Sequence, residues 1–130
     1  MRNEALAALL LLSVAAGALA GEAKTSPTVA REEAESNAKT PAGRRYDSAL
    51  ASSLDSWLRR AIEQCGRGVS PEDAVSFEVF VRISDAGEAE EVVVSPGTAV
   101  SRCAERAFRD ARYPHPPREG WWVRVPIELK

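Results

Sequence analysis

The chain has 130 residues, and its 17 basic and 19 acidic side chains give a formal net charge of only −2 at pH 7. Neither sign forms a long block, so we expect no nucleic-acid partner and no polybasic contact with a membrane surface. After an apolar amino-terminal segment, the remaining length is that of a single domain.

Residues 1–20 have the layout of a cleavable signal peptide. A weakly basic start, with Arg2 partly offset by Glu4, precedes an uncharged apolar stretch over residues 5–20. As a helix, that stretch would span about 24 Å, which is short of a hydrocarbon core of about 30 Å. We expect cleavage after Ala20 and export to the periplasm or the cell exterior. Only an uncleaved segment would place the chain at a membrane.

Residues 21–45 are rich in Ala, Glu, Lys, Ser and Thr, with Val29 as their one large aliphatic residue. This composition offers too little apolar surface to offset the entropy lost on ordering. We therefore predict a disordered linker over 21–45 and a folded domain over 46–130.

The folded domain is expected to open with a helix over residues 47–65. Apolar residues recur there at spacings of three and four, which predicts an amphipathic helix. Asp47 or Ser48 would cap its start, and Gly66 would close its end. The apolar stripe comprises Leu50, Leu54, Trp57, Leu58, Ala61, Ile62 and Cys65.

Two strands are predicted next, joined by a glycine-containing turn. Residues 75–84 alternate between apolar and polar side chains, and only Phe80 breaks the alternation. Residues 89–94 return as a second strand. Its apolar phase must slip by one residue, which predicts a bulge near Glu90 and Glu91.

A second helix and a last strand complete the chain. Thr98 is expected to cap a helix whose apolar positions are Val100, Cys103, Ala104, Ala107, Phe108 and Ala111. The proline-rich "YPHPP" then stops that helix. The last strand alternates through Trp121, Val123, Val125, Ile127 and Leu129.

The order helix, strand, strand, helix, strand predicts an α+β fold. We expect a small two-layer sandwich in which two helices pack on one face of a three-stranded antiparallel sheet. A crossover through the second helix would set the last strand beside the first. The opposite face of the sheet would then carry the side chains of Arg82, Trp122, Arg124 and Glu128.

The two cysteines lie on the apolar stripes of different helices. Cys65 and Cys103 would therefore point into the same core, and an exported chain with two cysteines is typical of one disulfide. Two buried free thiols or an intermolecular bridge are the alternatives. The spacing is not that of a redox dithiol.

No pattern in the sequence predicts catalytic, cofactor-binding or metal-binding residues, and none indicates a small-molecule substrate. His115 is the only histidine, whereas a metal site needs several converging ligands. No Gly-x-Ser-x-Gly turn or glycine-rich phosphate loop is present. A small metal-dependent or enzymatic factor centred on His115 is the alternative of another class.

The Trp-Trp pair near the end of the chain has two interpretations. Alternation sends Trp121 inward and Trp122 outward. An exposed tryptophan is often an anchor for a partner. Alternatively, Trp122 packs over the linker or over the strand beside it.

Three stretches of the chain carry a family resemblance: "DAGEAEEVVVSPG", "CAERAFRDARYPHPP" and "GWWVRVPIEL". They resemble the carboxy-terminal domain of TonB-type energy transducers, especially the cysteine-containing variant at the ends of AgmX/PglI-like proteins. The resemblance covers about residues 46–130. The positions that match the family's pattern are Gly87, residues 95–97, Cys103, residues 113–114, Pro116 and residues 122–129.

The resemblance implies a periplasmic, non-enzymatic domain that pairs its last strand with a partner peptide by strand addition. We therefore expect an envelope protein or peptide to be held by the edge of that strand and by Trp122, Arg124 and Glu128. Pro126 removes one donor from the pairing strand. The short linker and the cleavable signal depart from the pattern of a transducer, which argues against a role in energy transduction. If the signal stays uncleaved, a membrane-anchored accessory or energy-transducer-like subunit of an envelope transport complex is the alternative.

Overall fold

The computed structural model describes residues 24–129, and the predicted signal peptide over residues 1–20 lies outside them. None of the helices in this range combines the length and apolar character needed to cross a membrane. In chain order, the elements of the described range are α1 (Pro27–Ala38), α2 (Pro41–Asp55), α3 (Leu58–Gly66), β1 (Phe77–Ile83), β2 (Ala89–Ser95), α4 (Ala99–Asp110) and β3 (Trp121–Ile127).

The three strands form one antiparallel sheet in the order β2-β1-β3, so the last strand lies beside the first, as predicted. The predicted bulge is also present. Arg82 pairs with Glu91 and Ile83 pairs with Ala89, which leaves Glu90 as the extra residue of β2. This extra residue shifts the phase of β2 and turns Val92 toward the same face as Val81.

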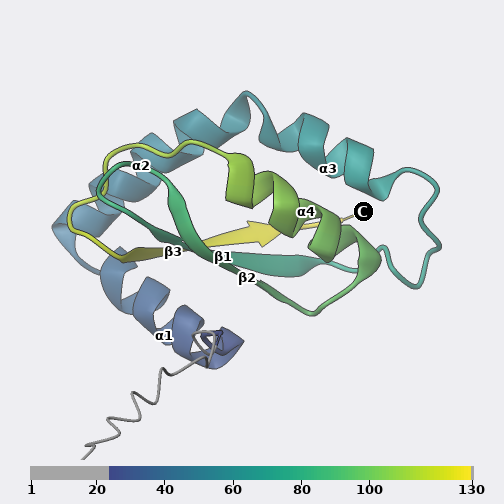
Figure 1. The fold of residues 1–130 in the computed structure, drawn as a ribbon, viewed down its shortest axis with the longest axis horizontal. Helices are drawn as coiled ribbons and strands as arrows, with labels where there is room; N and C mark the ends of the chain where they lie inside the picture. The colour runs from purple at the N-terminus through teal and green to yellow at the C-terminus, as the bar shows by residue number, and fades with distance from the viewer. Residues whose placement is uncertain (1–23, 130) are drawn as a thin grey trace, which may run out of the picture.

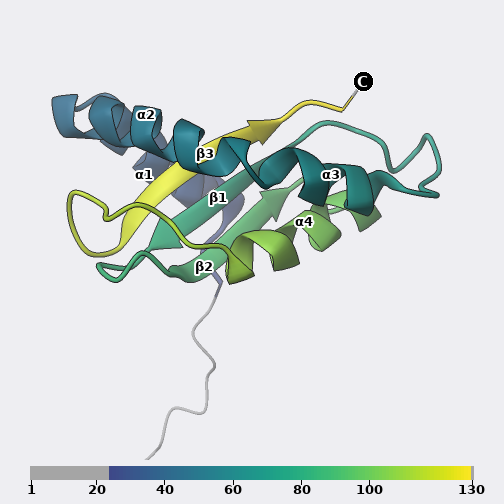
Figure 2. The same ribbon diagram turned by 90° about the horizontal axis from the view of Figure 1, so that it is seen from above.

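One face of the sheet carries the main core. Helices packed on an antiparallel sheet confirm the predicted α+β class. Figures 1 and 2 show α2, α3 and α4 together on this face. Thr98 caps α4 as predicted, since its hydroxyl accepts from the Ser101 amide at 3.1 Å while the Ser101 hydroxyl accepts from the Thr98 amide at 2.7 Å. The strand side chains in the core are Phe77, Val79, Val81, Ile83, Val92, Trp121, Val123, Val125 and Ile127.

The other face of the sheet is covered by α1, which lies on the side opposite the remaining helices (Figure 1). The prediction of a disordered linker over residues 21–45 is therefore wrong for its described part, residues 24–45. A second buried cluster fills this interface and consists of Ala30, Ala34, Phe80, Val93 and Trp122.

Helix α1 forms because its small side chains fit against large ones supplied by the sheet. Ser26 caps the helix, its hydroxyl accepting from the Val29 amide at 3.2 Å, and Pro27 occupies the first turn. Ala30 and Ala34 are one turn apart, so both face the sheet and bring the helix close to it. The apolar area that the linker composition lacked is thus contributed by another part of the chain.

The single helix predicted over residues 47–65 is two helices, α2 and α3. They are separated at Ser56 and Trp57, and α2 begins at Pro41 with Thr40 as its cap. Neither Asp47 nor Ser48 caps a helix, because α2 starts before them. The left-handed glycine in the loop after α3 is Gly68, with φ of +68°, and Gly66 is the last residue of α3.

The predicted disulfide is present between Cys65 at the end of α3 and Cys103 on α4, with an S–S distance of 2.07 Å and a Cα–Cα distance of 5.5 Å. The ring of Trp57 packs edge-on against Phe108, with centroids 5.3 Å apart. Helix α3 thus packs chiefly against α4, and the disulfide fixes the far end of that contact.

Buried tyrosines hold the segment after α4 against the core. The Tyr46 hydroxyl donates to the Pro114 carbonyl at 2.9 Å, and the Tyr113 hydroxyl donates to the Phe108 carbonyl. Burial raises the pKa of both hydroxyls, and the charges of neighbouring groups add to the rise. Both side chains therefore stay protonated and serve as structural donors.

We predict that the Cys65→Ala/Cys103→Ala double variant loses stability. The bond closes a loop with a sequence separation of 38 residues. The chain-entropy model assigns about 4 kcal/mol to such a loop. Urea denaturation of the oxidised wild type and of the variant measures the difference. A dithiol reductant should bring the wild type to the level of the variant and leave the variant unchanged. Equal midpoints for the oxidised proteins would contradict the prediction.

Candidate functional site

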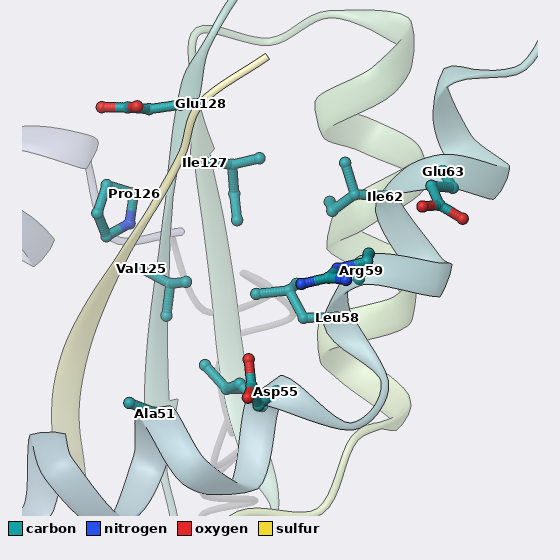
Figure 3. Close-up of a pocket in the computed structure, with 11 residues that line it drawn as sticks. Ala51, Asp55, Leu58, Arg59, Ile62, Glu63, Val125, Pro126, Ile127 and Glu128 are labelled. Carbon is teal, nitrogen blue, oxygen red and sulfur yellow. The ribbon is translucent and has the colours of Figure 1, made fainter. Parts of the chain in front are cut away.

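A groove lies between β3 and the helical pair α2–α3. Its volume is about 470 Å³, within the range of ligand pockets. Figure 3 shows its two apolar strand side chains pointing toward the helices, whereas Pro126 and Glu128 point away from them. The apolar wall consists of Leu54, Leu58, Ile62, Val125 and Ile127.

The backbone of β3 has an outer edge beside this groove. Pro126 pairs with Glu78 of β1 but has no amide proton, so its backbone groups face away from β1. Trp122 and Arg124 face the same way by alternation. Asn37 Nδ2 donates to the Trp122 carbonyl from this side at 3.1 Å. The rest of the edge offers the Arg124 amide and the carbonyls of Arg124 and Pro126.

The opposite edge of the sheet, along β2, is crossed by the chain before α1. Thr25 donates its amide and its hydroxyl to the Glu91 carboxylate at 2.6 and 2.9 Å. Lys24 Nζ lies 3.9 Å from the Glu105 carboxylate on α4. Because α1 and α4 lie on different faces, this ion pair spans the edge of β2. A strand added there would have to displace it, so within residues 24–129 the second half of β3 is the open edge.

Trp122 does not present its ring to a partner, which corrects its predicted role as a partner-binding residue. The residue is only 6% exposed, because α1 covers it in the second buried cluster. The Arg82 guanidinium lies 5.9 Å from its ring centroid. Packing over the segment before residue 46, the alternative interpretation, describes its environment.

Arg124, the second predicted partner-binding residue, lies in a charged cluster on the outer face. Its Nε donates to Glu78, and Arg31 Nη2 donates to the other carboxylate oxygen at 3.0 Å. The hydrogen bond from Arg124 lowers the pKa of Glu78, partial burial opposes this effect, and Arg31 adds to the lowering. The Arg124 side chain is 44% exposed, so part of it stays accessible at the edge.

Glu128, the third predicted partner-binding residue, is exposed just beyond the end of β3. It borders the groove but points away from the helices (Figure 3). Of the three predicted residues, Arg124 and Glu128 therefore lie at the open part of the edge, whereas Trp122 lies under α1.

His115 lies on the surface, away from the groove. Its side chain is 74% exposed, with Nδ1 2.8 Å from the Asp85 carbonyl oxygen and Nε2 3.6 Å from the Asp85 carboxylate. Within the described part of the chain, no group of three or more His, Cys, Asp or Glu side chains is placed to hold a metal ion. The geometry at His115 is that of an exposed imidazole beside one carboxylate.

Sequence reasoning missed the helical side of the groove. It assigned Leu54, Leu58 and Ile62 to one buried stripe, but only Leu54 is buried, while Leu58 and Ile62 are partly exposed. The break between α2 and α3 directs α3 against α4. Leu58 and Ile62 therefore lie beside β3 but do not cover it. The spacing within one helix carries no signal for such a break.

We predict that Trp122→Ala destabilises the protein by about 3–5 kcal/mol, because it leaves a cavity under α1. Urea denaturation measures the change. The matched control is Val75→Ala at a position that is 40% exposed, where we expect less than about 0.5 kcal/mol. A small effect at both positions would show that α1 does not cover Trp122 in solution.

We predict that Glu78→Gln weakens the dependence of stability on pH. A carboxyl with a lowered folded-state pKa adds stability above the ordinary carboxyl range, and this stability is lost as pH falls through the folded-state pKa. Between pH 7 and pH 3 the free energy of unfolding should fall less for the variant than for the wild type. Glu33→Gln, at an exposed position on α1, should keep the wild-type dependence. If the free energy of unfolding depends on pH in the same way in all three proteins, Glu78 does not contribute to the pH dependence of stability.

Comparison with known proteins identifies no relative. No protein-family model, no curated protein and no solved structure matches the chain. The resemblance of residues 46–130 to a TonB-type carboxy-terminal domain therefore stays a prediction. What the edge of β3 and its groove can bind follows from their own geometry and charge.

Proposed function

We propose that this chain is a non-enzymatic protein-binding module whose partner adds an extended segment to the free edge of β3. One observation carries the proposal. The second half of this edge has unpaired backbone groups at Arg124 and Pro126 and borders an apolar groove of about 470 Å³. Unpaired strand edges with side-chain pockets beside them are the usual setting for recognition by strand addition.

The pairing with β3 would be short. Asn37 already occupies the Trp122 carbonyl, and Pro126 has no amide to donate. The Arg124 amide is then the main edge donor, so backbone hydrogen bonds alone supply little affinity. Side chains of the partner that enter the groove beside Ile62 would supply the rest.

The resemblance noted in the sequence supports the same role. The resemblance implies a three-stranded antiparallel sheet with helices on one face, and the chain has a sheet of this kind in which α1 covers the other face as well. We propose a module of TonB C-terminal type that acts in the cell envelope after export. If residues 1–20 are not removed, the same edge would serve a membrane-anchored accessory subunit of an envelope transport complex.

The proposal is tested at the Arg124 amide. Peptides are selected from a random displayed library on the purified full chain, and their affinities are measured by fluorescence anisotropy. Arg124→Pro removes the edge donor, and we expect about tenfold weaker binding or more. Hydrogen exchange of the Arg124 amide should slow when a selected peptide binds to the wild type.

Arg124→Ala is the matched control, because it also loses the ion pair with Glu78 but keeps the amide. It should bind the selected peptides within about threefold of the wild type. Ile62→Asp tests the groove independently of the backbone and should also weaken binding. Equal binding by Arg124→Pro and Arg124→Ala, with no protection of the Arg124 amide, would rule out strand addition at this edge.

A further inference from the structure

We infer that the segment bound at the edge of β3 carries an apolar side chain for the groove and a basic side chain on either side of it. This inference rests on the proposed strand addition. It adds the chemistry of the partner, which follows from the charges around the groove and from their placement on α2, α3 and β3.

The mouth of the groove carries more negative than positive charge. Three carboxylates, those of Asp55, Glu63 and Glu128, line it together with one guanidinium, that of Arg59. Within residues 24–129, none of these four side chains takes part in an ion pair or a hydrogen bond. Their charges are therefore available to a partner.

The ends of the two helices strengthen this negative potential. Asp55 is the last residue of α2, and Glu63 lies in the last turn of α3. Neither helix has a basic residue in its last turn, although the partial charge at a helix carboxyl end is negative. A cation from a partner would be attracted by both the carboxylate and the helix end at each place.

The placement of these carboxylates on the two helices beside the groove suits an extended chain. Figure 3 shows Asp55 near one end of the groove and Glu63 near the other. Asp55 ends α2 and Glu63 lies in the last turn of α3, on either side of the break at Ser56 and Trp57. In a strand, alternate side chains share one face, and positions i−2 and i+2 are about 13 Å apart. An apolar side chain at i would then enter between Leu58 and Ile62, with basic side chains at i−2 and i+2 reaching the carboxylates.

The test uses three labelled heptapeptides with a central leucine: Thr-Lys-Thr-Leu-Thr-Lys-Thr, its Ser-for-Lys analogue and its Glu-for-Lys analogue. On the full wild-type chain at low salt, we expect the affinity to fall in that order. The lysine peptide should bind about tenfold more tightly than the glutamate peptide, and added salt should shrink this ratio.

In the double variant Asp55→Asn/Glu63→Gln, the affinities for the lysine and glutamate peptides should come within about twofold of each other. The matched control Glu33→Gln/Glu35→Gln removes two exposed carboxylates from α1 and should keep the wild-type ratio. Circular dichroism verifies that both double variants are folded.

The outcomes separate this inference from the proposed function. Equal affinity for all three peptides, with binding still lost in Arg124→Pro, would overturn the charge preference and leave strand addition standing. If no peptide binds the wild type and the library yields none, strand addition falls and the charge preference falls with it. Self-association that competes with peptide binding would identify a second copy of the chain as the occupant and would also overturn the inference.

Discussion

Burial of β1 on both faces is the constraint on which the rest of this structure depends. Phe77, Val79, Val81 and Ile83 face the main core, while Phe80 on the other face is fully buried. Phe80 places an aromatic ring between Glu78 and Arg82 on the outer face, so this face also needs cover, because exposed aromatic surface is costly in water. Helices α2, α3 and α4 supply one cover, and α1 supplies the other.

The way in which the sheet is covered decides which surface stays open. Helix α1 crosses the outer face from the edge of β2, where Thr25 holds Glu91, to the edge of β3, where Asn37 holds the Trp122 carbonyl. The contact at Trp122 occupies a backbone carbonyl that an added strand would need, and the contact at Glu91 holds the chain before α1 across the edge of β2. Helix α3 packs against α4 and leaves the second half of β3 beside a groove. The candidate site is therefore the part of the sheet that the helices do not reach.

Local patterns in the sequence were sufficient to predict most of the sheet and the helix α4 that packs on it. The alternation of β1, the phase slip of β2 and the cap at Thr98 each depend on neighbours within a few residues, so the spacing carries them. The pairing of Cys65 with Cys103 followed from two apolar stripes that face one core. The same patterns indicated only one half of the candidate site, the strand β3.

The sequence by itself determined the α+β class, the order of the three strands with a helix before the last of them, and the face that each strand turns to the main core, and it favoured a disulfide between Cys65 and Cys103. Only the tertiary structure decided that residues 27–38 form a helix, that Trp122 is buried and that a groove opens beside β3. Phe80, out of phase with its strand, was the local sign of a second buried face. Helix α1 has almost no large apolar residues of its own, so the stability of its packing comes from aromatic side chains distant in sequence, which no local pattern records.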